Sequence, residues 1–306
     1  MELVEFTRNV QKAVEERVGE GYQVEIQEVR KNNNVLLQGL IIHGTEQNIS
    51  PTIYLNSFWD AYEKGIPFVI IMERIMRIYE EDTPKENVDM SFFKDFERVK
   101  DRICYRLISA ERNRELLSGI PHIAYLDLAI CFFYAYQGEP LGKGSITIHA
   151  SHMEMWNTTC EELFELAQRN TPHLFPADWN SMETVIRELM KERKEDTDFF
   201  LNEEEQEEFL EELPMQILSN TDRVHGATCL LYPGVLAKWA KNREQNLYII
   251  PSSIHEIIVL PDTGTEDVRM LRNMISEVNS TQVEPEELLS NNLYYYDRLL
   301  NQVKIV

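Results

Sequence analysis

The sequence predicts an α+β protein with mixed, largely antiparallel sheets and packed helices. Segments with alternating apolar residues come in pairs joined by turn residues, which is typical of hairpins. Helical segments stand beside these hairpins instead of alternating with single strands. Neither a GxGxxG nor a P-loop signature occurs, so neither nucleotide-binding fold is supported. With 306 residues, 43% of them apolar, the chain can form one large or two modest domains.

The N-terminal part of the sequence predicts a helix, three strands, two more helices and then two further strands. Apolar residues at near-helical spacing predict helices over residues 3–18, 57–65 and 68–82. Residues 22–43 predict a hairpin that turns at three consecutive asparagines, 32–34, and residues 49–55 add a third strand. Two further strands are expected over residues 101–109 and 124–136, the second apolar on both faces and therefore central.

The remaining elements follow the same two patterns. Residues 145–156 are expected to continue the sheet, and a helix follows, capped by Thr158 or Thr159 with Glu162 as the capping-box partner. Later elements are strands over 215–220, 226–233, 247–251 and 255–261, helices over 234–243 and 262–278, and a final hairpin of Leu293–Asp297 and Gln302–Val306.

A highly charged segment suggests where two domains meet. Residues 188–212 contain twelve acidic and three basic residues, and few of them can be buried. We therefore expect an N-terminal α+β domain over 1–195, an acidic connector over 196–213 and a C-terminal α+β domain over 214–306.

The charge of the chain constrains its partners. Fifty-two acidic and 30 basic residues give a net charge of −22. This excess argues against direct binding of nucleic acid and against anionic membrane surfaces, because both need basic patches. It permits a basic protein as a partner, including the basic face of a nucleic-acid-binding protein.

The expected location is the cytoplasm. No apolar run reaches the roughly 18 residues that span a bilayer, and the charged N-terminus lacks the pattern of a signal peptide. The four cysteines are far apart and form no C-x-x-C pair, which favours reduced cysteines in a core over a zinc site. No cofactor is predicted.

The stretch YIIPSSIHEIIVLPD, residues 248–262, contains the catalytic candidates Ser253, His255 and Glu256. A nucleophile needs a base within hydrogen-bond reach and a third group that holds the base. On an extended strand Ser253 and His255 share a face, whereas Glu256 points the other way. The pattern favours a bend between two strands of one sheet, with His255 partly buried and Glu256 nearer to the surface; a binding surface and a catalytic cluster remain open.

The stretch HASHMEMW contains the metal-ligand candidates His149, His152 and Glu154. Histidines three residues apart can hold a metal ion if the backbone bends between them. On a regular strand the two histidines face opposite ways, and only His152 and Glu154 agree. A metal site therefore needs a further ligand, for example His255 reached across the sheet.

Several segments together resemble an uncharacterised bacterial family, a domain of unknown function common in anaerobic gut bacteria. They are ISPTIYLNSFWDAYEKG, IHASHMEMW, CLLYPGVL, YIIPSSIHEIIVLPD and VEPEELLSNNLYYYD. The similarity runs over nearly the full chain. It implies a bacterial cytoplasmic protein, and it assigns no activity and no functional residue.

Two functional hypotheses follow. The acid excess, the tyrosine-rich tail and the missing catalytic signature favour a non-enzymatic, acidic interaction protein, with a regulatory role or a role linked to mobile elements or defence. The alternative is a hydrolase or metal-dependent enzyme assembled from His149, His152, His255 and Glu256. The two differ in whether these histidines converge in space.

Overall fold

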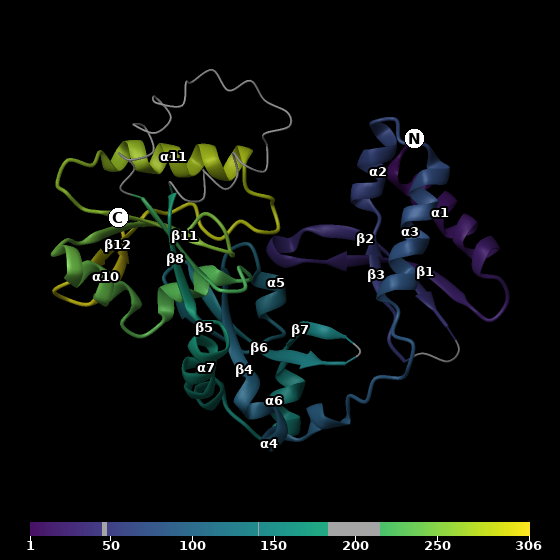
Figure 1. Ribbon diagram of the computed structural model, residues 1–306, viewed down its shortest axis with the longest axis horizontal. Coiled ribbons are helices and arrows are strands. Elements are labelled where there is room, and N and C mark those ends of the chain that lie inside the picture. Colours follow the sequence, from purple (N-terminus) through teal and green to yellow (C-terminus); the bar gives the residue numbers. More distant parts are fainter. Residues whose placement is uncertain (45–47, 140, 183–214) are drawn as a thin grey trace. The chain divides into compact units, whose positions relative to one another are not determined.

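The computed structural model describes residues 1–44, 48–139, 141–182 and 215–306. They form an α+β protein with two compact units (Figure 1). Unit 1 comprises Met1–Arg98 and Ala135–Ser145, and unit 2 comprises Val99–Tyr134 and Ile146–Val306. No helix in the described ranges has both the length and the apolar character needed to cross a membrane.

Unit 1 is built on a three-stranded antiparallel sheet, as the sequence predicts. Its strands, in the order β1–β2–β3, are Gln23–Arg30, Leu36–His43 and Thr52–Tyr54. Its main helices are α1 (Leu3–Val18), α2 (Asn56–Glu63) and α3 (Phe68–Asp82). The turn between β1 and β2 is the short 3₁₀ helix η1 (Asn32–Asn34), and the last two of its asparagines have positive φ. Asparagine tolerates this conformation better than most residues, which explains why the turn falls there.

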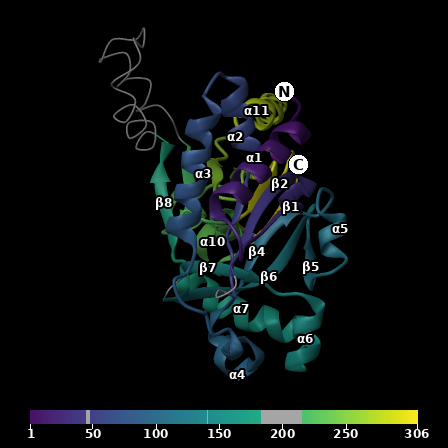
Figure 2. The ribbon, with the colours of Figure 1, turned by 90° about the vertical axis from the view of Figure 1, so that its right-hand side faces the viewer.

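The core of unit 1 lies between the helices and the sheet. Phe6, Val10 and Val14 recur every four residues on α1, and all three are fully buried. They pack in one cluster with Leu40 of β2 and Ile75 of α3. Figure 2 shows α1 and α3 beside this sheet. The helical period in the sequence therefore marks the buried face of each helix.

Unit 2 contains two sheets and the helices that pack against them. One is six-stranded and antiparallel, in the order β13–β12–β10–β11–β9–β8; the other has the order β4–β6–β5, with β7 paired to β6. The strands are β4 (Ile103–Ser109), β5 (His122–Tyr125), β6 (Leu128–Gly138), β7 (Gly142–Thr147), β8 (Ala177–Ser181), β9 (Gln216–Asn220), β10 (Leu247–Ile250), β11 (Ile257–Pro261), β12 (Tyr294–Asp297) and β13 (Gln302–Ile305). The helices are η2 (Ser91–Lys94) and α4 (Phe96–Val99) near the boundary of the units, then η3 (Lys100–Arg102), α5 (Arg114–Leu117), α6 (Ala150–Trp156), α7 (Cys160–Leu174), η4 (Gly226–Leu231), α10 (Val235–Arg243) and α11 (Val268–Thr281). Of these elements, η2, residues 96–98 of α4, residues 135–138 of β6 and residues 142–145 of β7 belong to unit 1.

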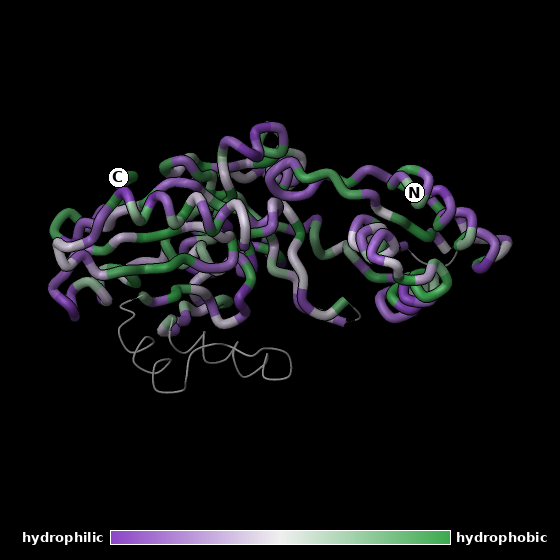
Figure 3. The backbone as a smooth tube through the Cα atoms, turned by 90° about the horizontal axis from the view of Figure 1, so that it is seen from above, coloured by the Kyte–Doolittle hydropathy of each residue, from purple (hydrophilic) through white to green (hydrophobic). Residues whose placement is uncertain are grey.

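The two serines of YIIPSSIHEIIVLPD lie in a bend, as expected from the sequence. The flanking strands β10 and β11 pair antiparallel, with Ile250 opposite Ile258. The bend is held by a later segment: the N–H of Ile254 donates to Glu287 O at 2.8 Å, and the N–H of Leu289 donates to Ser252 O at 2.9 Å. Helix α11 covers one face of this sheet with Leu271 and Ile275. Figure 3 shows hydrophobic stretches along the strands near the C-terminus.

One carboxylate of unit 2 is fully engaged in hydrogen bonds. Asp127, in the turn between β5 and β6, accepts from Ser290 Oγ at 2.6 Å, from Asn292 Nδ2 at 3.0 Å and from the hydroxyl of Tyr294. Burial and this hydrogen bond raise the pKa of Tyr294 well above its usual range. The network ties the start of β12 to the β5–β6 hairpin.

The outer edge of β4 is closed by side chains. The N–H of Tyr105 donates to Thr171 Oγ1 at 3.0 Å, and the N–H of Leu107 donates to Thr228 Oγ1 at 3.3 Å. The amide of Asn170 donates to Ile103 O at 2.9 Å. Backbone groups that no strand pairs are thus satisfied by α7 and η4.

Two expected strands are helical, which corrects the sequence interpretation. Residues 150–156 form α6, because His149 is extended and the chain turns there to bury Trp156. Residues 226–231 form the 3₁₀ helix η4, whose compact turns bring Thr228 against the edge of β4 and bury Cys229. Both segments contain apolar residues on all sides, a pattern that does not distinguish a buried strand from a buried helical turn.

The expected acidic connector, 196–213, lies outside the described residues. The chain on either side of it enters one sheet, because β8 pairs with β9 and Ser181 lies opposite Gln216. The division into two units falls elsewhere, at Arg98–Val99 and within β6 and β7.

Candidate functional site

The structure places the three catalytic candidates in the segment just before β11. Ser253 is buried, and its Oγ accepts a hydrogen bond from the N–H of His255 at 3.0 Å, which stabilises the bend. The His255 side chain is 28% exposed, and its Nε2 lies 3.4 Å from Oε1 of Glu287. The imidazole of His255 therefore faces the carboxylate of Glu287, while the hydroxyl of Ser253 accepts a backbone hydrogen bond. A catalytic role for the three residues stays a prediction.

Glu256 differs from the expectation that it would be nearer to the surface than His255. Both residues are half-buried. Burial raises the pKa of Glu256 above its usual range, and Glu287 adds to this effect, whereas His255 and Arg223 oppose it.

The metal candidates lie at the start of α6. The N–H of His149 donates to Nδ1 of His152 at 3.1 Å, and their ring centroids are 5.5 Å apart. Burial and the neighbouring His149 lower the pKa of His152. Glu154 is exposed two residues farther along, which on a helix is about 200° around the axis from His152. Across the residues that the structure describes, no three or more His, Cys, Asp or Glu side chains are arranged to hold a metal ion.

His255 meets a different histidine. Its ring stacks on His225, with the centroids 6.0 Å apart and the planes at 13°. The ring of His225 also lies near Phe133 of β6, at 6.2 Å between centroids, and the charge of Arg106 of β4 acts on it. Arg106 lies 6.0 Å from the Phe133 ring centroid and donates from Nη2 to Thr147 Oγ1 at 3.1 Å. We call Arg106, His225 and His255 the arginine–histidine cluster.

Electrostatics keep His225 neutral. Burial, then the charge of Arg106, then His255 lower its pKa to about 3. Burial lowers the pKa of Arg106 as well, although an arginine remains charged in proteins.

A glycine makes the stacking of the two histidines possible. A Cβ on Gly226 would lie 2.1 Å from Ser219 Oγ and 2.3 Å from His255 O. Ser219 Oγ donates to the same His255 O at 2.7 Å. His225, just before the glycine, adopts a left-handed conformation with φ 53°. Two segments of the chain pass so close to each other here that position 226 has room only for the hydrogen of a glycine, and not for a Cβ.

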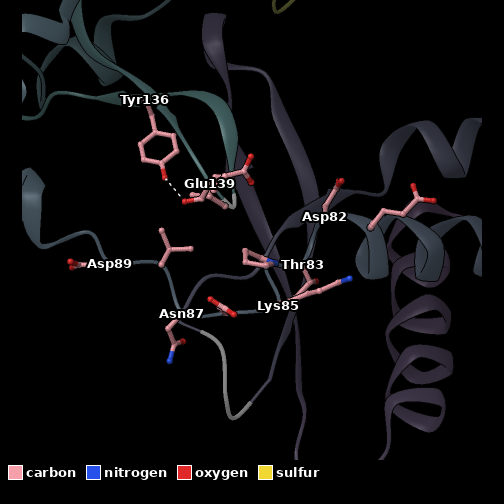
Figure 4. Close-up of a pocket in the computed structure, with 12 residues that line it drawn as sticks. Asp82, Thr83, Lys85, Asn87, Asp89, Tyr136 and Glu139 are labelled. Atoms are coloured by element: carbon pink, nitrogen blue, oxygen red, sulfur yellow. Dashed lines mark hydrogen bonds between the residues drawn. The ribbon is translucent and has the colours of Figure 1, made fainter.

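Unit 1 carries an acidic groove of about 770 Å³ (Figure 4). One wall is the end of α3 and the segment that follows it, and the other comes from the end of β6 and the residues just after it, where Tyr136 and Glu139 lie across from Asp82 and Lys85. Five carboxylates and one lysine line it, and all six side chains belong to exposed residues: Glu81, Asp82, Lys85, Glu86, Asp89 and Glu139.

The first wall of the acidic groove is fixed by hydrogen bonds. The Asn48 side chain pairs with both backbone groups of Val88, at 2.9 and 3.0 Å. The carboxylate of Asp89 accepts from the N–H of Ser91 at 2.8 Å. The backbone and side-chain hydrogen bonds from Ser91 lower the pKa of Asp89, so this group stays ionised in mildly acidic solution.

Sequence reasoning missed both the acidic groove and the composition of the cluster. The apolar residues within 81–89 show neither helical nor strand periodicity. The residues on the opposite wall of the groove lie some fifty positions farther along the chain. The net charge was the one available signal. Arg106 and His225 lie on elements far from His255 in the sequence, and only the fold brings the three together.

The comparisons with known proteins give a family and nothing more specific. No curated protein and no solved structure matches the chain. The model of a family of unknown function, DUF5688, matches residues 3–298, which include every strand and helix that forms the acidic groove and the arginine–histidine cluster. The chain belongs to this family of unknown function, DUF5688.

Proposed function

We propose that this chain is a non-enzymatic interaction protein that binds a basic segment of a partner protein in the acidic groove of unit 1. The observation that supports this most is the lining of the groove, where five exposed carboxylates face a space of about 770 Å³. A lysine- or arginine-rich peptide is the complementary ligand, because its charges meet carboxylates on both walls.

The apolar part of the lining suits the same ligand. Tyr136 supplies an aromatic ring, and Pro84, Val88 and Leu141 supply aliphatic surface. Lysine and arginine bury their aliphatic stems against such surface while their charged ends remain near carboxylates, and their cations are also attracted to aromatic rings.

Individual exposed ion pairs contribute about 0–1 kcal/mol, so a single pair would not hold a partner. Several carboxylates around one groove act together, and the net charge of −22 adds a long-range attraction for basic partners. Binding should therefore be fast and strongly weakened by salt.

We further propose that the protein acts in a bacterial cytoplasm, in a regulatory role or a role linked to mobile elements or defence. The resemblance of the chain and its missing catalytic signature support this. The hydrolase or metal-dependent alternative stays a prediction without comparable support from the geometry of Ser253, His149 and His152.

The test is the binding of a fluorescent ten-residue lysine-rich peptide to the full chain, followed by anisotropy. The double variant Glu86→Lys/Glu139→Lys reverses one charge on each wall of the groove. The matched control, Glu15→Lys/Glu16→Lys, makes the same change in net charge on exposed residues of α1. We expect the groove variant to bind about tenfold more weakly, with a smaller effect in the control.

An equal loss in both double variants would mean that net charge alone attracts the peptide, and the groove proposal would be wrong. Binding that does not weaken between low and physiological salt would contradict its electrostatic basis.

A further inference from the structure

The arginine–histidine cluster of unit 2 contains polar nitrogens that the described chain leaves without partners. Arg106 Nε, His225 Nδ1 and His255 Nδ1 are buried and form no hydrogen bond within the described residues. Buried polar groups of a native protein are nearly always satisfied, because an unsatisfied one costs about 1–3 kcal/mol. Three such nitrogens on neighbouring side chains indicate a missing common partner.

The charge of the cluster indicates what that partner is. Arg106 carries a fixed positive charge, its Nη2 is held by Thr147, and no carboxylate of the described chain forms an ion pair with it. A buried charge without a counter-ion is costly. Because the described residues supply no counter-ion for Arg106, the charge of the cluster favours an anion as its partner.

The charged groups described around the cluster lie near His255. Around the cluster, Glu287 contacts Nε2 of His255, and Glu256 and Arg223 lie close enough to influence each other electrostatically. The Nδ1 of His255 is on the other edge of the ring from this carboxylate. Arg106, His225 and His255 are each half-buried, so solvent reaches part of each residue.

We propose that the arginine–histidine cluster binds a small oxyanion, a carboxylate or a phosphate group. The guanidinium of Arg106 supplies the charge and a planar set of donors that matches either group. Neutral His225 donates from Nδ1 in the tautomer that carries its proton there. His255 donates from Nδ1 in the form that carries a proton on that nitrogen.

Charged groups around the cluster influence the affinity for the oxyanion. The ligand adds a negative charge next to His225, which opposes the effect of Arg106 on that ring. Glu256 and Glu287 on the side of His255 limit the affinity for highly charged ligands, because like charges repel.

The test uses calorimetry of the full chain with two probes, inorganic phosphate and acetate, which separate a phosphate from a carboxylate ligand. We expect saturable binding of at least one probe. Binding should weaken about tenfold or more in Arg106→Met, and little in Arg269→Met, which removes an exposed arginine of α11.

A second pair of variants covers the case in which Arg106→Met does not fold. His225→Asn keeps a donor close to the Nδ1 position, whereas His225→Leu removes it, so binding should persist in the first and fall in the second. Absence of saturable binding for both probes, or equal affinity in the wild type and Arg106→Met, would overturn the proposal. So would equal affinity in the two His225 variants.

Discussion

The acidic groove of unit 1 and the arginine–histidine cluster of unit 2 differ in how much water their charged groups retain. The five carboxylates of the groove are exposed, and each keeps most of its hydration although they repel one another. The cluster has a single fixed charge, yet burial beside that charge lowers the pKa of His225 to about 3. The difference teaches that desolvation, more than the number of charges, decides how strongly a charged site perturbs its neighbours.

The strongest way to break this comparison is Gly226→Ala, which should disrupt the packing around the cluster. A Cβ at this position meets the backbone oxygen of His255 at 2.3 Å, so backbone must move. We expect unfolding to become easier by about 4 kcal/mol, measured by chemical denaturation. The control Gly144→Ala in unit 1 adds a Cβ with nothing within 4 Å and should change stability little. A change of less than 1 kcal/mol in Gly226→Ala would show that the crossing is loosely packed.

A second substitution compares a half-buried carboxylate that accepts three hydrogen bonds with an exposed one. Asp127→Ala leaves the hydroxyls of Ser290 and Tyr294 and the amide of Asn292 without their acceptor. The loss should be about 3 kcal/mol in the free energy of unfolding. Glu86→Ala in the acidic groove should stay within about 0.5 kcal/mol, because its carboxylate is exposed. Equal effects in the two variants would remove the distinction between the two regions.

The smallest expected effect is the pH dependence that His225 confers. An unfolded histidine takes up a proton near pH 6.5, whereas folded His225 does so only near pH 3. Its contribution to stability is therefore complete above pH 6.5 and is lost as the pH falls toward 3, on the order of 1 kcal/mol per pH unit. Urea denaturation at pH 6.5 and 4.5 should show a shallower decline in His225→Gln than in the wild type. The same decline in both proteins would mean that His225 protonates as readily when folded.

The sequence identifies those helices and strands whose apolar residues recur at a regular spacing. The helix over 3–18 has the predicted bounds, because its apolar residues recur every four positions and two glycines follow it. The cap of α7 is also as predicted, since Thr159 Oγ1 accepts from the N–H of Glu162 at 3.2 Å. In both cases the deciding interactions are local, so a short stretch of sequence contains them.

The sequence does not reveal contacts that depend on the path of the chain. Nothing near His255 indicates that its ring stacks on His225, thirty residues earlier, or that Arg106 lies beside that second histidine. The strand expected over 226–233 fails for the same reason: Gly226 and Thr228 adopt a 3₁₀ helix to meet β11 and β4, which are distant in sequence. The candidate sites were therefore less predictable than the elements that carry them.

The closed edge of β4 has a consequence for the behaviour of the chain at high concentration. An open strand edge offers a template on which another chain can add a strand, which is a common start of aggregation. Thr171 and Thr228 occupy the N–H groups that such a strand would need. The two threonines thus prevent a strand of another chain from pairing with β4. Replacing both with valine would free these N–H groups and allow another chain to extend the sheet.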